Sequence, residues 1–240
     1  MNIENKTILI TGANRGIGRA LLEEALRRGA KRVYAGTRGE FRHADSRVVP
    51  LQLDVTSPAQ IEAAAEQIDR LDVIINNAGI AIFDDLSSLE IIDRHMDVNF
   101  LGMYRVTMAF LPLLKQSKGA IVNNLSLVAL APLPIIPAYS ISKAAALNLT
   151  QSLRALLAHE GVSVHAVVLG PVDTDMNRGF DIPKASTEST AMNIFDGLER
   201  NEDDIFPDPA SSSISEPWRS GFAKAMEREM AAFAPVPAGV

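Results

Sequence analysis

The sequence predicts an α/β protein built on one doubly wound parallel sheet. Short runs rich in β-branched residues alternate with longer helical patterns from the start of the chain, which is typical of βαβ units. A parallel sheet built in this way is covered by helices on both faces. No internal repeat, low-complexity segment or linker divides the 240 residues, so we expect a single domain over residues 1–240.

These patterns also place the individual strands and helices. Strands are expected at 6–11, 31–36, 48–53, 72–76, 119–125 and 162–169, with a further short strand within 203–208. Helices are expected at 17–29, 57–70, 88–116 with a break, 137–160 and 216–233. Ser57 and Pro58 suit the start of a helix, and Gly29 and Gly161 stand where helices should stop.

The pattern changes after residue 170. Residues 171–216 are rich in Asp, Ser, Thr and Pro, with one amphipathic patch at Thr190–Leu198. We expect this part to be mobile and to supply a lid over a ligand, at about 175–215.

The composition excludes several classes of site. The chain has no cysteine, which excludes disulfides, thiolate zinc sites, iron–sulfur clusters and a cysteine nucleophile, and which fits a reducing cytoplasm. The net charge of -6 disfavours a nucleic-acid partner. Basic residues gather only at Arg27, Arg28, Lys31 and Arg32, which we interpret as a solvated helix end.

Neither a membrane segment nor a metal site is predicted. The most apolar stretch, residues 125–137, is shorter than the roughly 20 residues that cross a bilayer, and it contains three prolines. The N-terminus lacks a cationic leader followed by an apolar run, so we expect a cytoplasmic protein. The histidines show no metal-ligand spacing and are expected to be structural or exposed: His43, His95, His159 and His165.

Glycines cluster directly after the first expected strand and before the first helix, with the spacing TGxxxGxG. At such a turn glycine lets the backbone bend sharply, and a pyrophosphate can approach the free N–H groups and the positive dipole end of the helix. The turn therefore predicts a dinucleotide site, with contacts expected from Gly12, Asn14, Arg15, Gly16, Ile17 and Gly18.

Four ordered motifs resemble those of the short-chain dehydrogenase/reductase family, in its short, non-extended branch. The glycine turn has the family's spacing, and residues 76–79 (NNAG) look like the family's NNAG element. Asn99 stands at the position of its active-site asparagine, while Ser126, Tyr139 and Lys143 match its Ser and TyrxxxLys set. The resemblance covers roughly residues 6–176 and implies a Rossmann fold and a nicotinamide-dependent oxidoreductase.

Tyr139 and Lys143 are four residues apart, so they share one face of a helix and the ammonium can lie near the phenol. A neighbouring cation favours the phenolate and lowers the tyrosine pKa toward working pH, as a general acid/base requires. We therefore expect Tyr139 to donate a proton to a carbonyl oxygen during reduction, while Ser126 hydrogen-bonds that oxygen. The resemblance implies that Lys143 also holds the nicotinamide ribose and that Asn99 holds a water linking Lys143 to solvent.

The cofactor is expected to be NADP(H). An NAD-preferring fold commonly places a carboxylate after the second strand, whereas this chain has Thr37 followed by Arg38, with Arg15 in the glycine turn. A guanidinium matches phosphate geometry, and an aspartate would repel it. The resemblance implies that Asp54 and Val55 contact the adenine, that Thr174 bonds the carboxamide, and that further contacts come from Asn77, Ala78, Gly79, Gly170 and Val172.

Two departures from the family pattern concern the later part of the chain. Leu169 replaces the proline that usually precedes the glycine after the sixth strand, so we expect a different loop course with Thr174 still within reach. The chain lacks the family's frequent glycine-rich C-terminus, so the sequence does not predict the tetramer contact that is usual in the family. The resemblance still implies a homodimer or homotetramer, packed through the helices near 100–116 and 137–158.

The expected substrate is a hydrophobic ketone or aldehyde, or the corresponding alcohol. Apolar residues lie between the expected catalytic Ser126 and Tyr139 and in the lid, namely Leu127, Leu133, Ile135, Ile136, Met176 and Phe180. The leading hypothesis is thus an NADP(H)-dependent carbonyl reductase. The alternative is a nucleotide-binding regulatory or scaffold protein that keeps the fold without turnover, since fold does not imply function.

Overall fold

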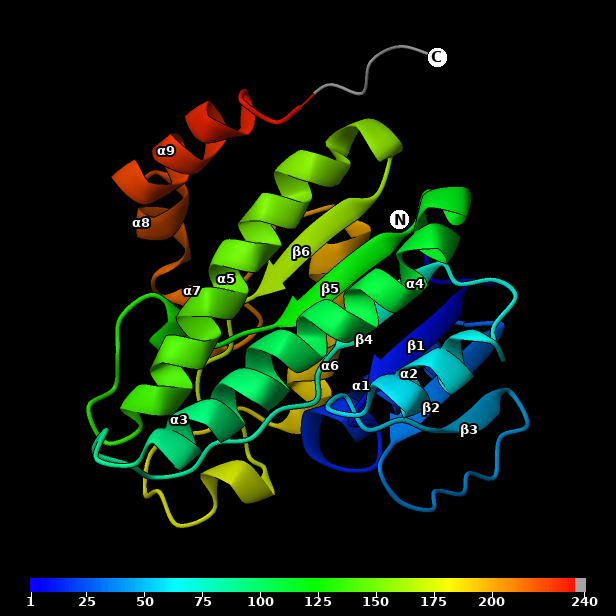
Figure 1. Cartoon of the computed structure of the whole chain (residues 1–240), viewed down its shortest axis with the longest axis horizontal. Helices are drawn as coiled ribbons and strands as arrows, with labels where there is room; N and C mark the ends of the chain where they lie inside the picture. The colour runs from blue at the N-terminus through cyan, green and yellow to red at the C-terminus, as the bar shows by residue number, and fades with distance from the viewer. Residues whose placement is uncertain (236–240) are drawn as a thin grey trace.

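A computed structural model of the chain describes residues 1–235 and shows one twisted sheet with helices on both faces (Figure 1). Within these residues the sheet has 7 strands in the order β3-β2-β1-β4-β5-β6-β7. Every neighbouring pair is parallel. The predicted doubly wound parallel sheet is confirmed, because β1 lies between β2 and β4 and the chain winds outward in both directions from that point.

The strands are short and apolar. Their bounds are β1 Thr7–Thr11, β2 Arg32–Thr37, β3 Val48–Gln52, β4 Val73–Asn76, β5 Ala120–Asn124, β6 Ser163–Val167 and β7 Asp204–Ile205. In the register of the sheet, Ile8 of β1 lies opposite Val33 of β2 on one side and Val73 of β4 on the other. All six strands up to β6 begin and end within two residues of the predicted bounds, and β7 lies inside the predicted 203–208 segment.

The helices connect these strands. Their bounds are α1 Gly16–Arg27, α2 Pro58–Ala65, α3 Leu89–His95, α4 Met103–Ser117, α5 Pro137–Leu157, α6 Thr187–Glu199, α7 Pro209–Ser212, α8 Ser215–Arg219 and α9 Phe222–Ala231. A π-helical turn, Met96–Gly102, joins α3 to α4, and short 3-10 turns lie at Leu127–Ala129, Ala158–Glu160 and Asp175–Asn177. The predicted break within 88–116 is this π-helical turn. None of the helices in residues 1–235 is both long and apolar enough to cross a bilayer.

Two apolar layers bury the two faces of the sheet. On one face, Ile8 and Ile10 of β1 pack with α1 and with Phe195 of α6. On the other face, Leu9 of the same strand packs with α2, α4 and α5, for example with Phe110. Alternate residues of one strand therefore serve opposite layers, which is why its sequence is apolar throughout.

The segment after β6 is more regular than the sequence suggests. The predicted lid, 175–215, contains α6, whose buried Ala191, Ile194 and Phe195 pack in the same core as α1. The amphipathic patch at Thr190–Leu198 is thus a structural helix, because it covers the sheet beside α1. The irregular stretch between β6 and α6 is left as the candidate lid.

The prediction of one continuous closing helix over 216–233 is wrong. The chain forms α8, then turns at Ser220 and Gly221, and starts again as α9. A side chain on Gly221 would come within 2.7 Å of the Pro217 carbonyl oxygen, so glycine allows this sharp turn.

The basic cluster at the end of α1 is also corrected in part. The side chain of Arg28 is only 12% exposed and bonds to the carboxylates of Glu24, Asp196 and Glu199 at 2.5–2.7 Å. It ties α1 to α6, whereas Arg27, Lys31 and Arg32 lie at the surface as predicted.

Candidate active site

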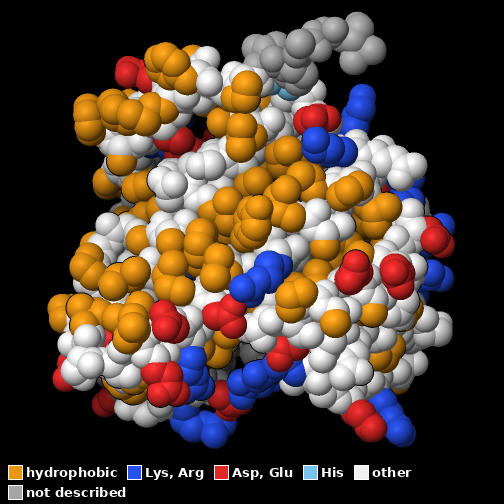
Figure 2. All heavy atoms as spheres, viewed as in Figure 1, with side chains coloured by type: hydrophobic (Ala, Val, Ile, Leu, Met, Phe, Trp, Pro, Cys, Tyr) orange, Lys and Arg blue, Asp and Glu red, His pale blue; other side chains and the backbone are white. Residues whose placement is uncertain are grey.

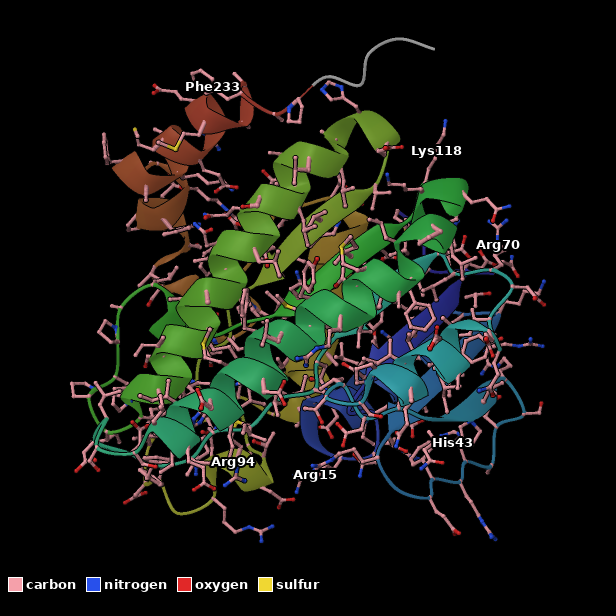
Figure 3. The ribbon with its side chains drawn as sticks, viewed as in Figure 1. Arg15, His43, Arg70, Arg94, Lys118 and Phe233 are labelled. Carbon is pink, nitrogen blue, oxygen red and sulfur yellow. The ribbon has the colours of Figure 1, made fainter. Side chains whose placement is uncertain are left out.

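The residues predicted to carry the chemistry gather at the carboxyl ends of β1, β4 and β5, beside the point where the strand order reverses. In open parallel sheets this edge is where ligands bind. Figure 3 shows Arg15 at this edge and Lys118 and Arg70 at the opposite end of the sheet.

The glycine turn folds as its spacing predicts. Gly12 and Gly16 adopt positive φ of 67° and 52°, a conformation that side chains rarely tolerate. A Cβ on Gly18 would lie 2.1 Å from the Gly12 carbonyl oxygen, so the third glycine lets α1 pack directly on the turn. No side chain caps the first turn of α1, whereas Ser57, Ser88 and Ser186 cap other helices. These uncapped N–H groups suit the pyrophosphate of a dinucleotide.

Asn77 fixes the glycine turn to the end of β4. Its amide nitrogen donates to the carbonyls of Thr11 and Gly12 at 2.9 and 3.3 Å, and its Oδ1 accepts from Asn124 at 2.9 Å. The N–H groups of Asn77 and Ala78 donate to the Thr11 hydroxyl, each at 3.0 Å. These bonds show that Asn77 holds the glycine turn in place, and the cofactor contact of Asn77 and Ala78 stays a prediction.

Ser126, Tyr139 and Lys143 come together around the end of β5. Ser126 begins the short 3-10 turn after β5, and its hydroxyl lies near enough to the Tyr139 phenol to act to lower the pKa of that group. The Lys143 ammonium lies 5.7 Å from the centre of the Tyr139 ring and donates to the backbone carbonyl of Asn124 at 2.7 Å. The predicted shared face of α5 is thus observed. The contact with Asn124 is one that the sequence analysis did not find.

The pKa values of this pair differ from the expectation. Burial raises the pKa of Tyr139 to about 12, although the Ser126 hydroxyl acts to lower it. Burial also lowers the pKa of Lys143 to about 8. The predicted lowering of the phenol pKa is wrong for the protein without a ligand, because removal of both groups from water outweighs their mutual influence.

Asn99 lies in the π-helical turn and is 3% exposed. Its Oδ1 accepts from the Ile80 N–H at 2.8 Å, and its amide nitrogen donates to the Ile80 carbonyl and the Ser142 hydroxyl. A Cβ on Gly79 would lie 3.2 Å from Asn99 Oδ1 and 3.8 Å from the Lys143 ammonium, so these three residues are neighbours. Both amide hydrogens of Asn99 are used, and its oxygen already accepts one bond, so a second lone pair on that oxygen is what its side chain offers to the predicted water.

The end of β2 holds the residues expected to select the cofactor. Thr37 is buried and its hydroxyl donates to the Gly39 carbonyl at 2.7 Å, while Arg38 lies exposed. Arg38 lines a cavity of about 350 Å³ together with Arg42, which the sequence analysis missed. The sequence signal that could have identified Arg42 is its position four residues after Arg38 in the same loop.

Asp54 and Val55 follow β3. The Asp54 carboxylate accepts from the N–H and hydroxyl of Thr56 at 2.9 and 2.8 Å, so it stabilises its own turn. Val55 is buried, and a Cβ on Gly102 would lie 2.7 Å from it. The adenine contact of both residues stays a prediction.

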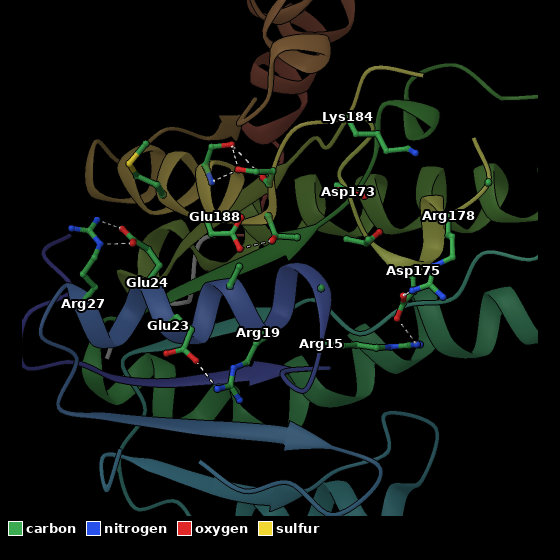
Figure 4. Close-up of a pocket in the computed structure, with 18 residues that line it drawn as sticks. Arg15, Arg19, Glu23, Glu24, Arg27, Asp173, Asp175, Arg178, Lys184 and Glu188 are labelled. Atoms are coloured by element: carbon green, nitrogen blue, oxygen red, sulfur yellow. Dashed lines mark hydrogen bonds and ion pairs between the residues drawn. The ribbon is translucent and has the colours of Figure 1, made fainter. Parts of the chain in front are cut away.

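Arg15 and Thr174 bring the glycine turn against the loop after β6. A Cβ on Gly16 would lie 3.2 Å from the Thr174 methyl group, so Thr174 is within reach of the turn, as predicted. The Arg15 guanidinium pairs with Asp175 at 3.5 Å, and Arg178 pairs with the same carboxylate. Figure 4 shows these side chains around a cavity of about 1180 Å³ between α1, this loop and the start of α6.

Two predicted cofactor residues have other contacts. The Gly170 N–H donates to the Asp208 carboxylate at 2.7 Å, and a Cβ on Gly170 would lie 2.4 Å from that group. Val172 is 1% exposed and its carbonyl accepts from the Asn177 amide at 2.8 Å. Both residues shape the loop that carries Thr174, and this structural role is separate from the predicted cofactor contact.

The apolar residues proposed for the substrate lie on the segments that follow β5 and β6, the strands after which Ser126 and Thr174 stand. Leu133, Ile135 and Met176 are each at least 40% exposed. The ring of Phe180 packs 5.6 Å from that of Phe83, which lies in the loop after β4. Phe83 is an addition to the predicted set, and the signal that could have found it is its position four residues after the NNAG element.

The fold and site define a nucleotide-binding α/β protein of the Rossmann type. A family model described as short chain dehydrogenase matches residues 6–184. The chain belongs to the short-chain dehydrogenase family.

Individual relatives agree with this membership. The chain is 34% identical to mouse estradiol 17-beta-dehydrogenase 2 over 197 residues, covering 75% of this chain and 51% of that protein. It is 34% identical to the oxidoreductase UcpA of Salmonella typhimurium, covering 72% of each. The chain therefore spans about half the length of the estradiol dehydrogenases of mouse and rat that it matches.

A solved structure is similar over nearly the whole chain. It is a short chain dehydrogenase from Burkholderia cenocepacia in complex with NADP, 36% identical, with a TM-score of 0.86 and coverage of 95% of this chain and 99% of the other. The predicted single Rossmann fold is confirmed by this similarity.

Proposed function

We propose that the protein is an NADP(H)-dependent oxidoreductase that interconverts a hydrophobic ketone or aldehyde and its alcohol. The observation that carries this proposal is the convergence of Ser126, Tyr139 and Lys143 beside the uncapped start of α1. A protein that only bound a nucleotide would need the glycine turn but not this set of three polar groups. The relatives named dehydrogenase or oxidoreductase support the same class.

Each of the three side chains then has one task. The cofactor supplies or accepts a hydride. Tyr139 gives its proton to the carbonyl oxygen during reduction and takes it back during oxidation, while Ser126 donates a hydrogen bond that orients that oxygen. Lys143 lies close enough to favour the phenolate form once it is charged, and it is also placed to bond a ribose hydroxyl.

Preference for NADP(H) rests on the charges at the end of β2. Arg38 and Arg42 line one cavity, and Thr37 stands where a carboxylate would repel a 2′-phosphate. The Burkholderia relative was solved in complex with NADP, which supports the same choice. We therefore propose Arg38 and Arg42 as the phosphate-binding pair.

The substrate and the assembly follow from exposed apolar surface. Leu133, Ile135 and Met176 are exposed on the segments that follow β5 and β6, which supports a hydrophobic carbonyl compound. Figure 2 shows a separate apolar face across α4 and α5, where Tyr104, Met108 and others are exposed. We propose that a second copy of the chain covers this face in a homo-oligomer.

The test is cofactor oxidation by the purified protein with a panel of aryl and alkyl ketones, in parallel with NADPH and NADH. We expect turnover with NADPH preferred. Tyr139→Phe should reduce turnover at least 1000-fold, on the order expected when the proton donor is lost, while leaving NADPH affinity within about twofold. Binding of both cofactors without turnover of any carbonyl or alcohol would favour the scaffold alternative instead.

A further inference from the structure

Residues 80–84, which we name the strap, cross from the end of β4 to the first turn of the helix that carries Tyr139. The strap is held at its start by Asn99, which bonds both the N–H and the carbonyl of Ile80 at 2.8 and 2.9 Å. In the middle, the Ile82 N–H donates to His95 Nε2 at 3.0 Å. The π-helical region and the last residue of α3 therefore fix the first half of the strap.

His95 is fully buried and its tautomer is defined by its contacts. Nδ1 lies 2.8 Å from the Ile91 carbonyl, which can only accept, so Nδ1 carries the hydrogen. Nε2 is then a free lone pair for the Ile82 N–H. The ring also meets that of Tyr139 edge-on, with 6.2 Å between the centres. The anchor of the strap thus touches the catalytic tyrosine.

The far end of the strap supplies what α5 lacks. Pro137 opens α5, and the preceding Ile136 provides no side-chain cap. The Asp84 carboxylate accepts from the Ala138 N–H at 3.2 and 3.4 Å, and the Asp84 N–H donates to the Ile135 carbonyl at 3.5 Å. A carboxylate at a helix start satisfies an orphan N–H and complements the helix dipole.

We propose that Asp84 is a positioning residue for Tyr139, acting as an N-cap supplied from 54 residues away. Tyr139 directly follows the capped Ala138, so the cap sets where the first turn of α5 begins and with it the phenol. The strap holds this turn at a fixed distance from the π-helical region that carries Asn99. The inference rests on the proposed oxidoreductase function.

The test compares Asp84→Ala with the matched control Asp85→Ala. Asp85 is the exposed neighbour, and its carboxylate accepts from the Ser87 N–H at 3.0 Å within its own turn, just as Asp84 accepts from the Leu86 N–H at 3.1 Å, so both variants lose one such local bond. NADPH affinity is measured by fluorescence titration, and kcat is expressed per NADPH-binding site, which removes any unfolded fraction. A displacement of catalytic groups by about 1 Å can cost roughly 100-fold in rate.

We expect Asp84→Ala to lower kcat per site roughly 10- to 100-fold with NADPH affinity within about twofold, and Asp85→Ala to behave as wild type. Asp84→Asn, which keeps an acceptor, should recover most of the loss. If Asp84→Ala does not fold, Asp84→Glu replaces it, because the extra methylene displaces the carboxylate. This variant should also lower kcat per site while NADPH affinity is kept.

Three results would contradict the proposal. Unchanged kcat per site in Asp84→Ala, or equal losses in Asp84→Ala and Asp85→Ala, would overturn the positioning role while the proposed function stands. Absence of carbonyl turnover in the wild-type protein would overturn the proposed function, and the role of Asp84 with it.

Discussion

At the scale of single residues, the site is built from polar groups that are costly to bury. Lys143 is 6% exposed and its ammonium has the Asn124 carbonyl as a hydrogen-bond acceptor. Tyr139 keeps its proton strongly because burial disfavours the phenolate. These groups lower the stability of the protein without a ligand, which is common for residues arranged for chemistry.

The pKa of Lys143 predicts how stability depends on pH. The folded protein releases this proton at about pH 8, whereas the unfolded chain releases it near 10.5. Between these values the unfolded state binds more protons, so the free energy of unfolding rises with pH, by about 3 kcal/mol in total. Tyr139 acts in the opposite direction only above pH 10, because its folded pKa is raised to about 12.

Urea unfolding at pH 7 to 10 checks this expectation with Lys143→Met. At pH 7 the variant avoids the cost of burying a charge but loses the hydrogen bond to Asn124. The difference in the free energy of unfolding at one pH therefore mixes two effects, and only its change with pH tests the pKa. The free energy of unfolding of wild type, relative to the variant, should rise from pH 8 upward. A difference that stays constant over this range would contradict the lowered pKa.

A second prediction at this scale concerns the cofactor's phosphate. Arg38→Ala should weaken NADPH binding roughly 10- to 100-fold, the value of a lost charge-assisted hydrogen bond, and should leave NADH almost unaffected. Arg32→Ala, at the opposite end of β2, is the matched control. Isothermal titration with both cofactors measures the effect, and equal losses for NADPH and NADH would refute the assignment of Arg38.

At the scale of elements, helix packing decides what the irregular segments can do. α6 lies against α1 through Phe195, which is fully buried and also contacts the Arg28 guanidinium, 5.6 Å from the ring centre. This packing anchors one end of the loop that carries Thr174 and Asp175. The candidate lid is therefore a loop between two fixed elements, β6 and α6.

Phe195→Ala should lower the free energy of unfolding by about 3–5 kcal/mol, since it leaves a cavity in the core between α1 and α6. Phe222→Ala serves as the control, because Phe222 is 79% exposed and should change stability by no more than about 0.5 kcal/mol. Denaturant unfolding of both variants measures the difference. Similar values for the two would show that α6 is not packed as described.

At the scale of the whole molecule, a buried charge cluster joins the C-terminal helices to the edge of the sheet. Asp204 of β7 bonds to Arg154 at 3.0 Å, to Lys224 at 2.8 Å and to the indole N–H of Trp218 at 2.8 Å. Glu227 completes the cluster by pairing with Arg154 and Lys224. Burial acts to raise the pKa of Asp204, but the two cations more than offset it, so that pKa is lowered.

Asp204→Ala should release α8 and α9, because it leaves Arg154 and Lys224 with Glu227 as their remaining buried carboxylate and leaves the Trp218 indole N–H without its acceptor, at a cost of about 3 kcal/mol. The only tryptophan of the chain, Trp218, reports the change as a red shift of its fluorescence, together with faster proteolysis after residue 208. Asp203→Ala is the control, since the Asp203 side chain is 56% exposed. An unshifted spectrum in Asp204→Ala would show that the cluster does not hold these helices.

The sequence by itself determined the alternating strands and helices, the glycine turn and the spacing of Ser126, Tyr139 and Lys143. These follow from local rules, because residues a few positions apart share a strand face or a helix face. The sequence was misleading for charged residues whose ion-pair partners lie far away in the chain. Arg28 reads as a surface residue until Asp196 and Glu199 lie beside it.

Only the tertiary structure decided which distant residues meet. Asp84 caps a helix that begins 53 residues later, Asn124 accepts from Lys143, and Arg15 of the glycine turn pairs with Asp175 of the candidate lid. No local pattern marks such pairs, since their closeness comes from the crossover connections of the sheet. The pKa values of Tyr139 and Lys143 were also decided by the tertiary structure, because they depend on how far the folded chain excludes water from the two groups.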